Sequence, residues 1–313
     1  MREEPVGTGG DPSFRAGYVT IMGEPNVGKS TLLNRILKQK ISIVSSKPQT
    51  TRHRILGILT EETYQIVFLD TPGIIKPRYL LQEAMMQFAG RAIADADVLL
   101  FMIDALDPNT GPDLAHAEAF RRLQELQKPV YLVINKIDLI PKNLLLPIIE
   151  FYSHAFPFRE IFPISALTGE GTGDLLKALV PLLPLHPALY PPDIVSEQSE
   201  RFFVAEIIRE KVFRACHEEV PYATTVDVLE FKERAHGKWF IAADIYVERD
   251  SQKGILIGKK GAMLKELGGQ ARKDIEEFLG HPVFLELHVK VREKWREKPE
   301  WLQRLGYGGE QKV

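Results

Sequence analysis

Short apolar runs alternate with amphipathic stretches along the first 180 or so residues of the chain. Two of the apolar runs flank the polar segment Glu61 to Thr63 and predict an antiparallel hairpin. The strand-like runs are residues 17–22, 55–60, 64–69, 98–103, 130–134 and 161–164, and helical spacing is found at 32–37 and near 79–95, 113–127, 143–155 and 173–180. This alternation predicts an α/β domain with a mixed, mostly parallel sheet that is covered on both faces.

A proline-rich stretch ends this pattern. Pro181, Pro184, Pro187, Pro191 and Pro192 crowd one segment in which neither a helix nor a central strand can continue. Beyond it the order is helix, strand, strand, helix, strand, at residues 200–214, 224–231, 238–248, 260–279 and 283–292. We therefore expect a flexible arm (1–15), a first domain (16–183), a linker (184–199) and a smaller α+β domain with a C-terminal helix or tail (200–313).

The composition agrees with a two-domain globular protein. The chain has 313 residues, of which 44% are hydrophobic and 26% charged. It contains no apolar run of transmembrane length and no apolar signal core, so we expect a cytoplasmic protein. The single cysteine, Cys216, excludes an internal disulfide.

Residues 23–30 match the phosphate-binding loop G-x-x-x-x-G-K-[ST] and lie between a predicted strand and a predicted helix. In such a loop the backbone N–H groups surround the phosphates, and the helix N-terminus adds its positive dipole end. We expect Lys29 to reach the β- and γ-phosphates and Ser30 to ligate Mg²⁺. The nucleotide-binding residues expected here are Gly23, Asn26, Val27, Gly28, Lys29, Ser30 and Thr31.

Two further motifs suit the γ-phosphate end of a nucleotide. Asp70 ends a predicted strand, where it can hold Mg²⁺ through water, and the N–H of Gly73 can meet the γ-phosphate. The polar loop at 47–52 is long enough to cover that phosphate, and either Thr50 or Thr51 completes the metal shell; we favour Thr51. The predicted metal set is Ser30, Thr51 and Asp70, and the predicted catalytic set is Lys29, Thr51 and Gly73.

The remaining motifs point to guanine. Asn135, Lys136 and Asp138 follow a strand, and a buried Asp138 carboxylate can accept two hydrogen bonds from guanine but not from adenine. Ser165, Ala166 and Leu167 follow the next strand and offer backbone donors to the guanine carbonyl. A strand-end aspartate is often only a turn former, but five motifs in this order, each at a strand end, predict a GTPase domain that binds GTP and GDP.

The residue after Gly73 is Ile74, where small signalling GTPases carry a glutamine that orients water. Because isoleucine neither donates nor accepts a hydrogen bond, we expect slow unaided hydrolysis. Asn26 suggests K⁺ as a second cation beside Mg²⁺.

The second domain holds a G-x-x-G motif, Gly258 to Gly261, within a basic stretch. KH modules use such a loop to clamp about four nucleotides of single-stranded RNA, and the order of elements fits the type II arrangement. Ile255 is a further candidate for the groove floor. The predicted RNA-binding residues are Ile257, Gly258, Lys259, Lys260, Gly261, Met263 and Lys265.

The segments 49–53 and 70–74 resemble the bacterial Era family of GTPases, and the resemblance extends over nearly the whole chain after the first fifteen residues. It implies a monomeric P-loop GTPase domain followed by a type II KH domain. It also implies binding to the 3′ end of 16S ribosomal RNA and a role in maturation of the 30S subunit.

Two alternatives remain open at this point. The basic stretch could meet anionic lipid at the inner face of the cell membrane instead of RNA, as in a peripheral membrane regulator. Trp295, Trp301, Leu302 and Leu305, at the C-terminal end, could stack on bases or form the apolar face of a packed terminal helix; we favour packing.

Overall fold

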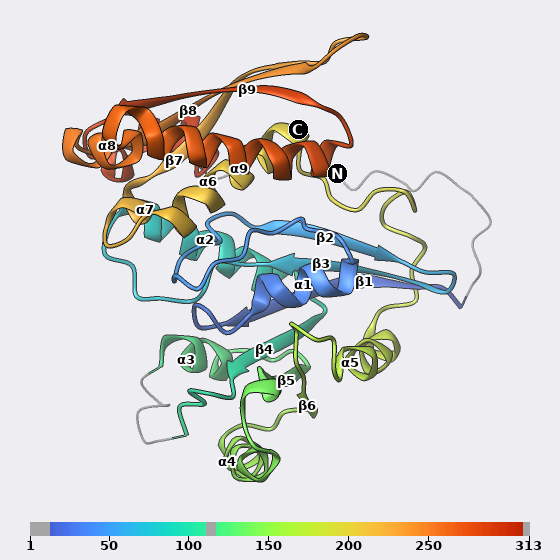
Figure 1. Cartoon of the computed structure of the whole chain (residues 1–313). Helices are drawn as coiled ribbons and strands as arrows, with labels where there is room; N and C mark the ends of the chain where they lie inside the picture. Colours follow the sequence, from blue (N-terminus) through green and yellow to red (C-terminus); the bar gives the residue numbers. More distant parts are fainter. Residues whose placement is uncertain (1–12, 111–116, 309–313) are drawn as a thin grey trace.

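The computed structural model describes residues 13–110 and 117–308, which form two domains (Figure 1). The first is built on a six-stranded sheet in the order β2-β3-β1-β4-β5-β6. Only β2 runs antiparallel to its neighbour, so the mixed, mostly parallel sheet is confirmed. The strands are β1 (Arg15–Gly23), β2 (Ile55–Thr60), β3 (Tyr64–Asp70), β4 (Val98–Asp104), β5 (Val130–Asn135) and β6 (Glu160–Pro163).

Helices cover both faces of this sheet. One apolar cluster joins the sheet to α1 and α5, and a second joins it to α3 and α4. The helices are α1 (Lys29–Leu37), α2 (Leu80–Asp95), α3 (Glu118–Gln124), α4 (Leu145–Ala155) and α5 (Thr172–Leu179). The predicted helix at 113–127 is shorter among the described residues, and its positions 113–116 lie outside them.

The second domain is a three-stranded sheet, β7-β8-β9, with helices on one side (Figure 1). β7 (Thr225–Lys232) and β8 (Trp239–Val247) form a hairpin, and β9 (Val283–Val291) pairs parallel to β8. The helices are α6 (Glu200–Ala215), α7 (Val220–Ala223), α8 (Asp250–Ile257), α9 (Ala262–Leu279) and α10 (Pro299–Arg304). The smaller α+β domain is thus confirmed. Helix α8 was not predicted, because it has only eight residues and Gly254 interrupts its pattern.

The predicted linker lies along the edge of the first sheet. The N–H of Ile58 on β2 donates to the carbonyl of Val195 at 2.8 Å, and the hydroxyl of Ser196 donates to the carbonyl of Leu56 at 2.5 Å. The segment between the domains is therefore hydrogen-bonded to β2. The predicted N-terminal arm falls almost wholly on residues 1–12, outside the described ones, and β1 already begins at Arg15.

The second domain packs directly on the first. Nearly every residue of α6 from Phe203 to Phe213 is buried, including charged ones, since one side of the helix faces its own sheet and another faces the first domain. At the C-terminal end, Trp295, Leu302 and Tyr307 join α2 of the first domain in one apolar cluster. None of the described helices is long and apolar enough to cross a membrane.

Candidate nucleotide and RNA sites

The phosphate loop joins β1 to α1 and holds a buried lysine. Gly23 has a φ of 151°, and a Cβ there would lie 2.3 Å from the Met102 carbonyl oxygen, so only glycine fits the turn. The Lys29 ammonium donates to the carbonyl oxygens of Glu24 at 2.7 Å and Gly23 at 3.2 Å. Burial lowers the pKa of Lys29 to about 8, although Asp70 and Glu24 oppose that shift. A phosphate at this position would supply the negative charge that the buried ammonium lacks.

Four oxygen-bearing side chains converge beside the loop. The Asp70 carboxylate accepts from the hydroxyls of Ser30 at 2.7 Å and Ser42 at 2.8 Å, and Ser30 is hydrogen-bonded to Thr51 at 2.9 Å. Burial raises the pKa of Asp70 despite these contacts and the nearby Lys29. Its second oxygen, Oδ1, is buried without a partner among the described residues. Hydroxyl and carboxylate oxygens are the ligands that Mg²⁺ prefers, so these residues fit the ion.

The structure distinguishes the two candidate threonines. The Thr51 hydroxyl faces Ser30, whereas the Thr50 hydroxyl donates to the Lys47 carbonyl at 2.7 Å. Ser42 is a member of this cluster that sequence reasoning missed, and no motif around it gave a signal.

The turn after β3 lies against the phosphate loop. A Cβ on Gly73 would lie 2.7 Å from the backbone nitrogen of Pro25, and the N–H of Ile74 donates to the Gly23 carbonyl at 3.1 Å. The Ile74 side chain is buried in the core of the first domain. This position therefore presents no polar side chain to the nucleotide cavity.

Asn135 connects the phosphate loop to the guanine-side loop. Its amide nitrogen donates to the Val27 carbonyl at 2.7 Å, and its amide oxygen accepts from the Ala166 N–H at 2.8 Å. Lys136 makes an ion pair with Asp104. Asp138 is exposed, contrary to the buried carboxylate that the sequence argument assumed. Because water can hydrogen-bond an exposed carboxylate, the pairing selects guanine only if the bound base itself shields Asp138 from water.

The backbone donors after β6 differ from expectation. The N–H of Ser165 donates to the Glu170 carbonyl at 3.0 Å, and that of Ala166 is taken by Asn135. Among the described residues, the Leu167 N–H alone of these three has no partner. Arg35, which carried no signal in the sequence, donates to the Leu167 carbonyl and to the Ala166 carbonyl at 3.3 Å, and so fixes this loop on α1.

These motifs surround a cavity of about 460 Å³, within the usual range for a small-molecule site. Asn26 at its edge donates from its amide to the Ser46 carbonyl at 2.9 Å. Four of the predicted residues, Gly23, Val27, Asp70 and Ser165, do not line the cavity. The predicted residues that line it are Asn26, Gly28, Lys29, Ser30, Thr31, Thr51, Gly73, Asn135, Lys136, Asp138, Ala166 and Leu167, and Ile43 to Ser46 line it without having been predicted.

A second hollow, of about 510 Å³, lies between α9 and β9 of the second domain. The G-x-x-G loop links α8 to α9, and its Gly258 and Gly261 have φ values of 70° and 79°. Lys259 and Lys260 are exposed on the loop. The hollow is lined by Gly261, Leu264, Lys265, Gly268, Gly269, Arg272, Leu285 and Leu287.

Only Gly261 and Lys265 of the predicted RNA-binding residues line this hollow. Ile257 packs on the domain core, and Met263 lies against Gly258. The glycine pair Gly268-Gly269 was missed, although two glycines inside a predicted helix are a signal of close approach by another group.

Comparisons with known proteins cover both domains. The family model described as "50S ribosome-binding GTPase" matches residues 18–136, and the KH domain model matches residues 219–296. GTPase Era of Geobacter metallireducens is 53% identical over 298 residues, which are 95% of this chain and 99% of that protein. GTPase Era of Geotalea daltonii is 50% identical over 297 residues, with the same coverage.

Two solved structures share the fold along nearly the whole chain. A variant of Aquifex aeolicus Era bound to GDP and AlF4⁻ has a TM-score of 0.88 and 42% identity, covering 94% of this chain and all of that one. Era in complex with MgGDPNP and nucleotides 1506–1542 of 16S ribosomal RNA has a TM-score of 0.89 and 42% identity, covering 94% of this chain and 99% of that one.

Proposed function

The chain belongs to the Era family of GTPases, and we propose that its KH domain binds the 3′ end of 16S ribosomal RNA in support of 30S subunit maturation. The observation that carries the proposal is the hollow between α9 and β9. It is lined by three leucines, by Gly268 and Gly269, which carry no side chain, and by the cations Lys265 and Arg272. Bases can lie on an apolar floor while cations meet the phosphates, which is how KH modules hold single strands.

The relative solved with 16S ribosomal RNA suggests the sequence to test. The family model that is described as a 50S ribosome-binding GTPase matches residues of the GTPase domain only. The RNA in the relative is from the small subunit, and we give it more weight because that relative covers both domains.

In the first domain we propose that Ser30, Thr51 and Asp70 hold Mg²⁺ with GTP or GDP. The ion would neutralise phosphate charge as the terminal phosphoryl group is transferred to water. Lys29 would bind the β- and γ-phosphates, the Gly73 N–H would donate to the γ-phosphate, and Asp138 would select guanine. Because Ile74 points into the core, no side chain at that position orients water, which supports a slow intrinsic rate.

We further propose that the protein acts as a monomer at the ribosome in the cytoplasm.

The test of the RNA-binding function is a titration of the full chain with an RNA of the 16S 3′ end, with a base-shuffled RNA of the same length, and with vesicles of anionic lipid. We expect the first RNA to bind at least about tenfold more tightly than the second. Equal affinity for the two RNAs would remove the sequence-specific function. Binding to vesicles without binding to RNA would favour the peripheral membrane regulator.

A further inference from the structure

Helix α6 of the KH domain contacts the loop that carries Thr51. The Arg209 guanidinium donates to the backbone carbonyl oxygen of Thr50 at 2.5 Å, across 159 residues of sequence. Glu206, one turn earlier, accepts from Arg209 Nε at 2.7 Å and also from its Nη2. Both side chains are almost fully buried, so the guanidinium cannot turn away without leaving a buried charge uncompensated.

Arg52 anchors the other side of Thr51 to the same domain. Its guanidinium donates to the carbonyl oxygens of Thr224 at 2.7 Å, Tyr222 at 3.0 Å and Pro221 at 3.1 Å, at the end of α7. The residue before Thr51 and the residue after it are therefore both tied to the KH domain.

These anchors determine where Thr51 points. A peptide unit is planar, so fixing the Thr50 carbonyl fixes the plane that leads into the Thr51 backbone. The Thr50 hydroxyl is turned to Lys47, and the Thr51 hydroxyl is left facing Ser30 at 2.9 Å. A misplacement of about 1 Å at such a site can cost a large factor in rate, so the anchor bears on catalysis.

We propose that Arg209 is a positioning residue for GTP binding and hydrolysis. By holding the Thr50 carbonyl, it keeps the Thr51 hydroxyl beside Ser30, and the KH domain thereby completes the GTP-bound form of the first domain. This inference rests on the proposed role of Thr51 in the Mg²⁺ site. By linkage, GTP should in turn strengthen the docking of α6 on the loop.

The test removes the guanidinium without leaving an unpaired buried charge. In Glu206→Met/Arg209→Met, apolar side chains of similar length replace the ion pair, a change that proteins often tolerate. Arg201→Met, at an exposed position of the same helix, is the matched control. Affinities for GDP and for a non-hydrolysable GTP analogue are measured with Mg²⁺, with kcat measured alongside and folding checked by thermal denaturation.

We expect the double variant to lose about tenfold in affinity for the GTP analogue, the factor for one hydrogen bond from a charged donor. Its affinity for GDP should stay within about twofold of the parent, because Thr51 faces the γ-phosphate end of the site. Arg201→Met should behave like the parent. Equal losses for the two nucleotides would overturn the proposal, because they would assign Arg209 to the fold alone.

A second variant covers the case in which the double variant does not fold. Arg209→Lys keeps a cation for Glu206 but lacks the planar fork that reaches both partners. It should show the same selective loss, smaller in size, and a folded Lys variant with the parental ratio of affinities would overturn the proposal.

Thr51→Ala separates this inference from the proposed function. Thr51→Ala should by itself weaken the GTP analogue selectively; if it does not, the role of Thr51 in the metal site fails. If Arg209 acts through Thr51, the losses from the two changes should not add when they are combined. Additive losses would refute the positioning role while leaving Thr51 in the site.

Discussion

Tyr307, near the C-terminal end of the chain, stacks on His53, with ring centroids 4.3 Å apart and 15° between the ring planes. His53 follows Arg52 in the loop that carries Thr51, and the ring of Phe202 of α6 lies nearly perpendicular to it, with ring centroids 5.3 Å apart and 82° between the planes. Burial lowers the pKa of His53 to about 4, so the ring is neutral at neutral pH. The loop that carries Thr51 is therefore packed against residues from both the first helix and the C-terminal segment of the KH domain.

Replacing Asp138 should change the base preference of the GTPase. Asp138→Asn presents an amide where guanine needs an acceptor. GTP affinity should fall by roughly 10- to 100-fold, because the hydrogen bonds from the guanine N–H groups to a charged carboxylate are lost. Xanthosine triphosphate, which has a carbonyl in place of the exocyclic amine, should bind better than it does to the parent. Titration of both nucleotides decides the matter, and an equal loss for both would remove Asp138 from the base site.

Potassium should accelerate hydrolysis relative to sodium if Asn26 takes part in a second cation site. Its amide nitrogen donates to the Ser46 carbonyl, and its amide oxygen accepts no hydrogen bond from the described residues, so it is available to a cation. Turnover is compared in KCl and NaCl at matched ionic strength, and Asn26→Ala should abolish the difference. Identical turnover of the parent in the two salts would exclude the site.

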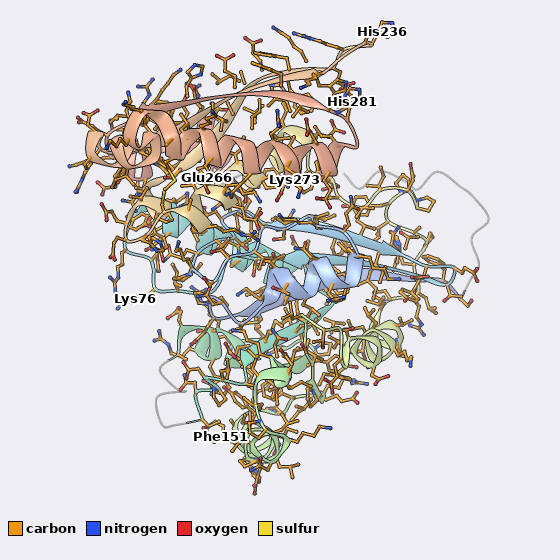
Figure 2. All side chains as sticks on the ribbon, in the orientation of Figure 1. Lys76, Phe151, His236, Glu266, Lys273 and His281 are labelled. Carbon is orange, nitrogen blue, oxygen red and sulfur yellow. The ribbon has the colours of Figure 1, made fainter. Side chains whose placement is uncertain are left out.

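A negative charge in the G-x-x-G loop should reduce RNA binding. Gly261→Asp is the sharper test, because a Cβ there meets no atom within 4 Å, whereas one on Gly258 would lie 2.7 Å from the Met263 Cβ. Gly237→Asp is the matched control: its φ of 85° is similar, its surroundings are equally open, and it lies beside His236 at the far tip of the β7–β8 hairpin (Figure 2).

We expect Gly261→Asp to bind the 16S 3′-end RNA at least about tenfold more weakly, on the scale of one lost charge-assisted contact. Gly237→Asp should bind like the parent, and both variants should retain GTP affinity. If folded Gly261→Asp binds RNA normally, the RNA site lies elsewhere.

Removing the loop lysines should change the salt dependence of RNA binding. Each phosphate contact on a single strand contributes about 0.7 to the slope of log affinity against log salt concentration. Lys259→Ala/Lys260→Ala should flatten that slope by up to about 1.4 and leave GTP affinity unchanged. A slope identical to the parent's would show that neither lysine contacts a phosphate.

Trp295 should stabilise the fold and not stack on RNA. Its side chain is fully buried, and its indole N–H donates to the Ala223 carbonyl at 2.8 Å. Trp295→Ala should lower the free energy of unfolding by ~3–5 kcal/mol, as measured by denaturant titration, because it leaves a large cavity. Trp301→Ala, at a half-buried position, should cost less. Loss of RNA affinity at unchanged stability would instead support base stacking by Trp295.

The sequence by itself determined the fold class and predicted the chemistry of the nucleotide site. Alternating apolar runs gave the sheet and its covering helices, because the period of burial is a local property of each strand and helix. Gly23, Lys29, Ser30, Asp70 and Asp138 were predicted as site residues for a related reason. Each sits in a short motif whose residue types are required by the phosphate, the metal or the base.

The tertiary structure alone decided which residues connect the two domains and which segments meet within each domain. Arg209 and Arg52 donate to backbone carbonyl oxygens of the other domain, and Arg35 does the same to a distant segment of its own domain; every residue has a carbonyl, so no residue type marks the acceptor. The hollow between α9 and β9 likewise needs Gly268 and Gly269 of α9 to meet Leu285 and Leu287 of β9, a pairing set by packing. Trp295 and Leu302 were expected from the sequence to pack, but only the docking of the KH domain placed them, together with Tyr307, against α2 of the other domain. Contacts between segments far apart in the chain depend on the whole fold, so a local sequence pattern does not predict them.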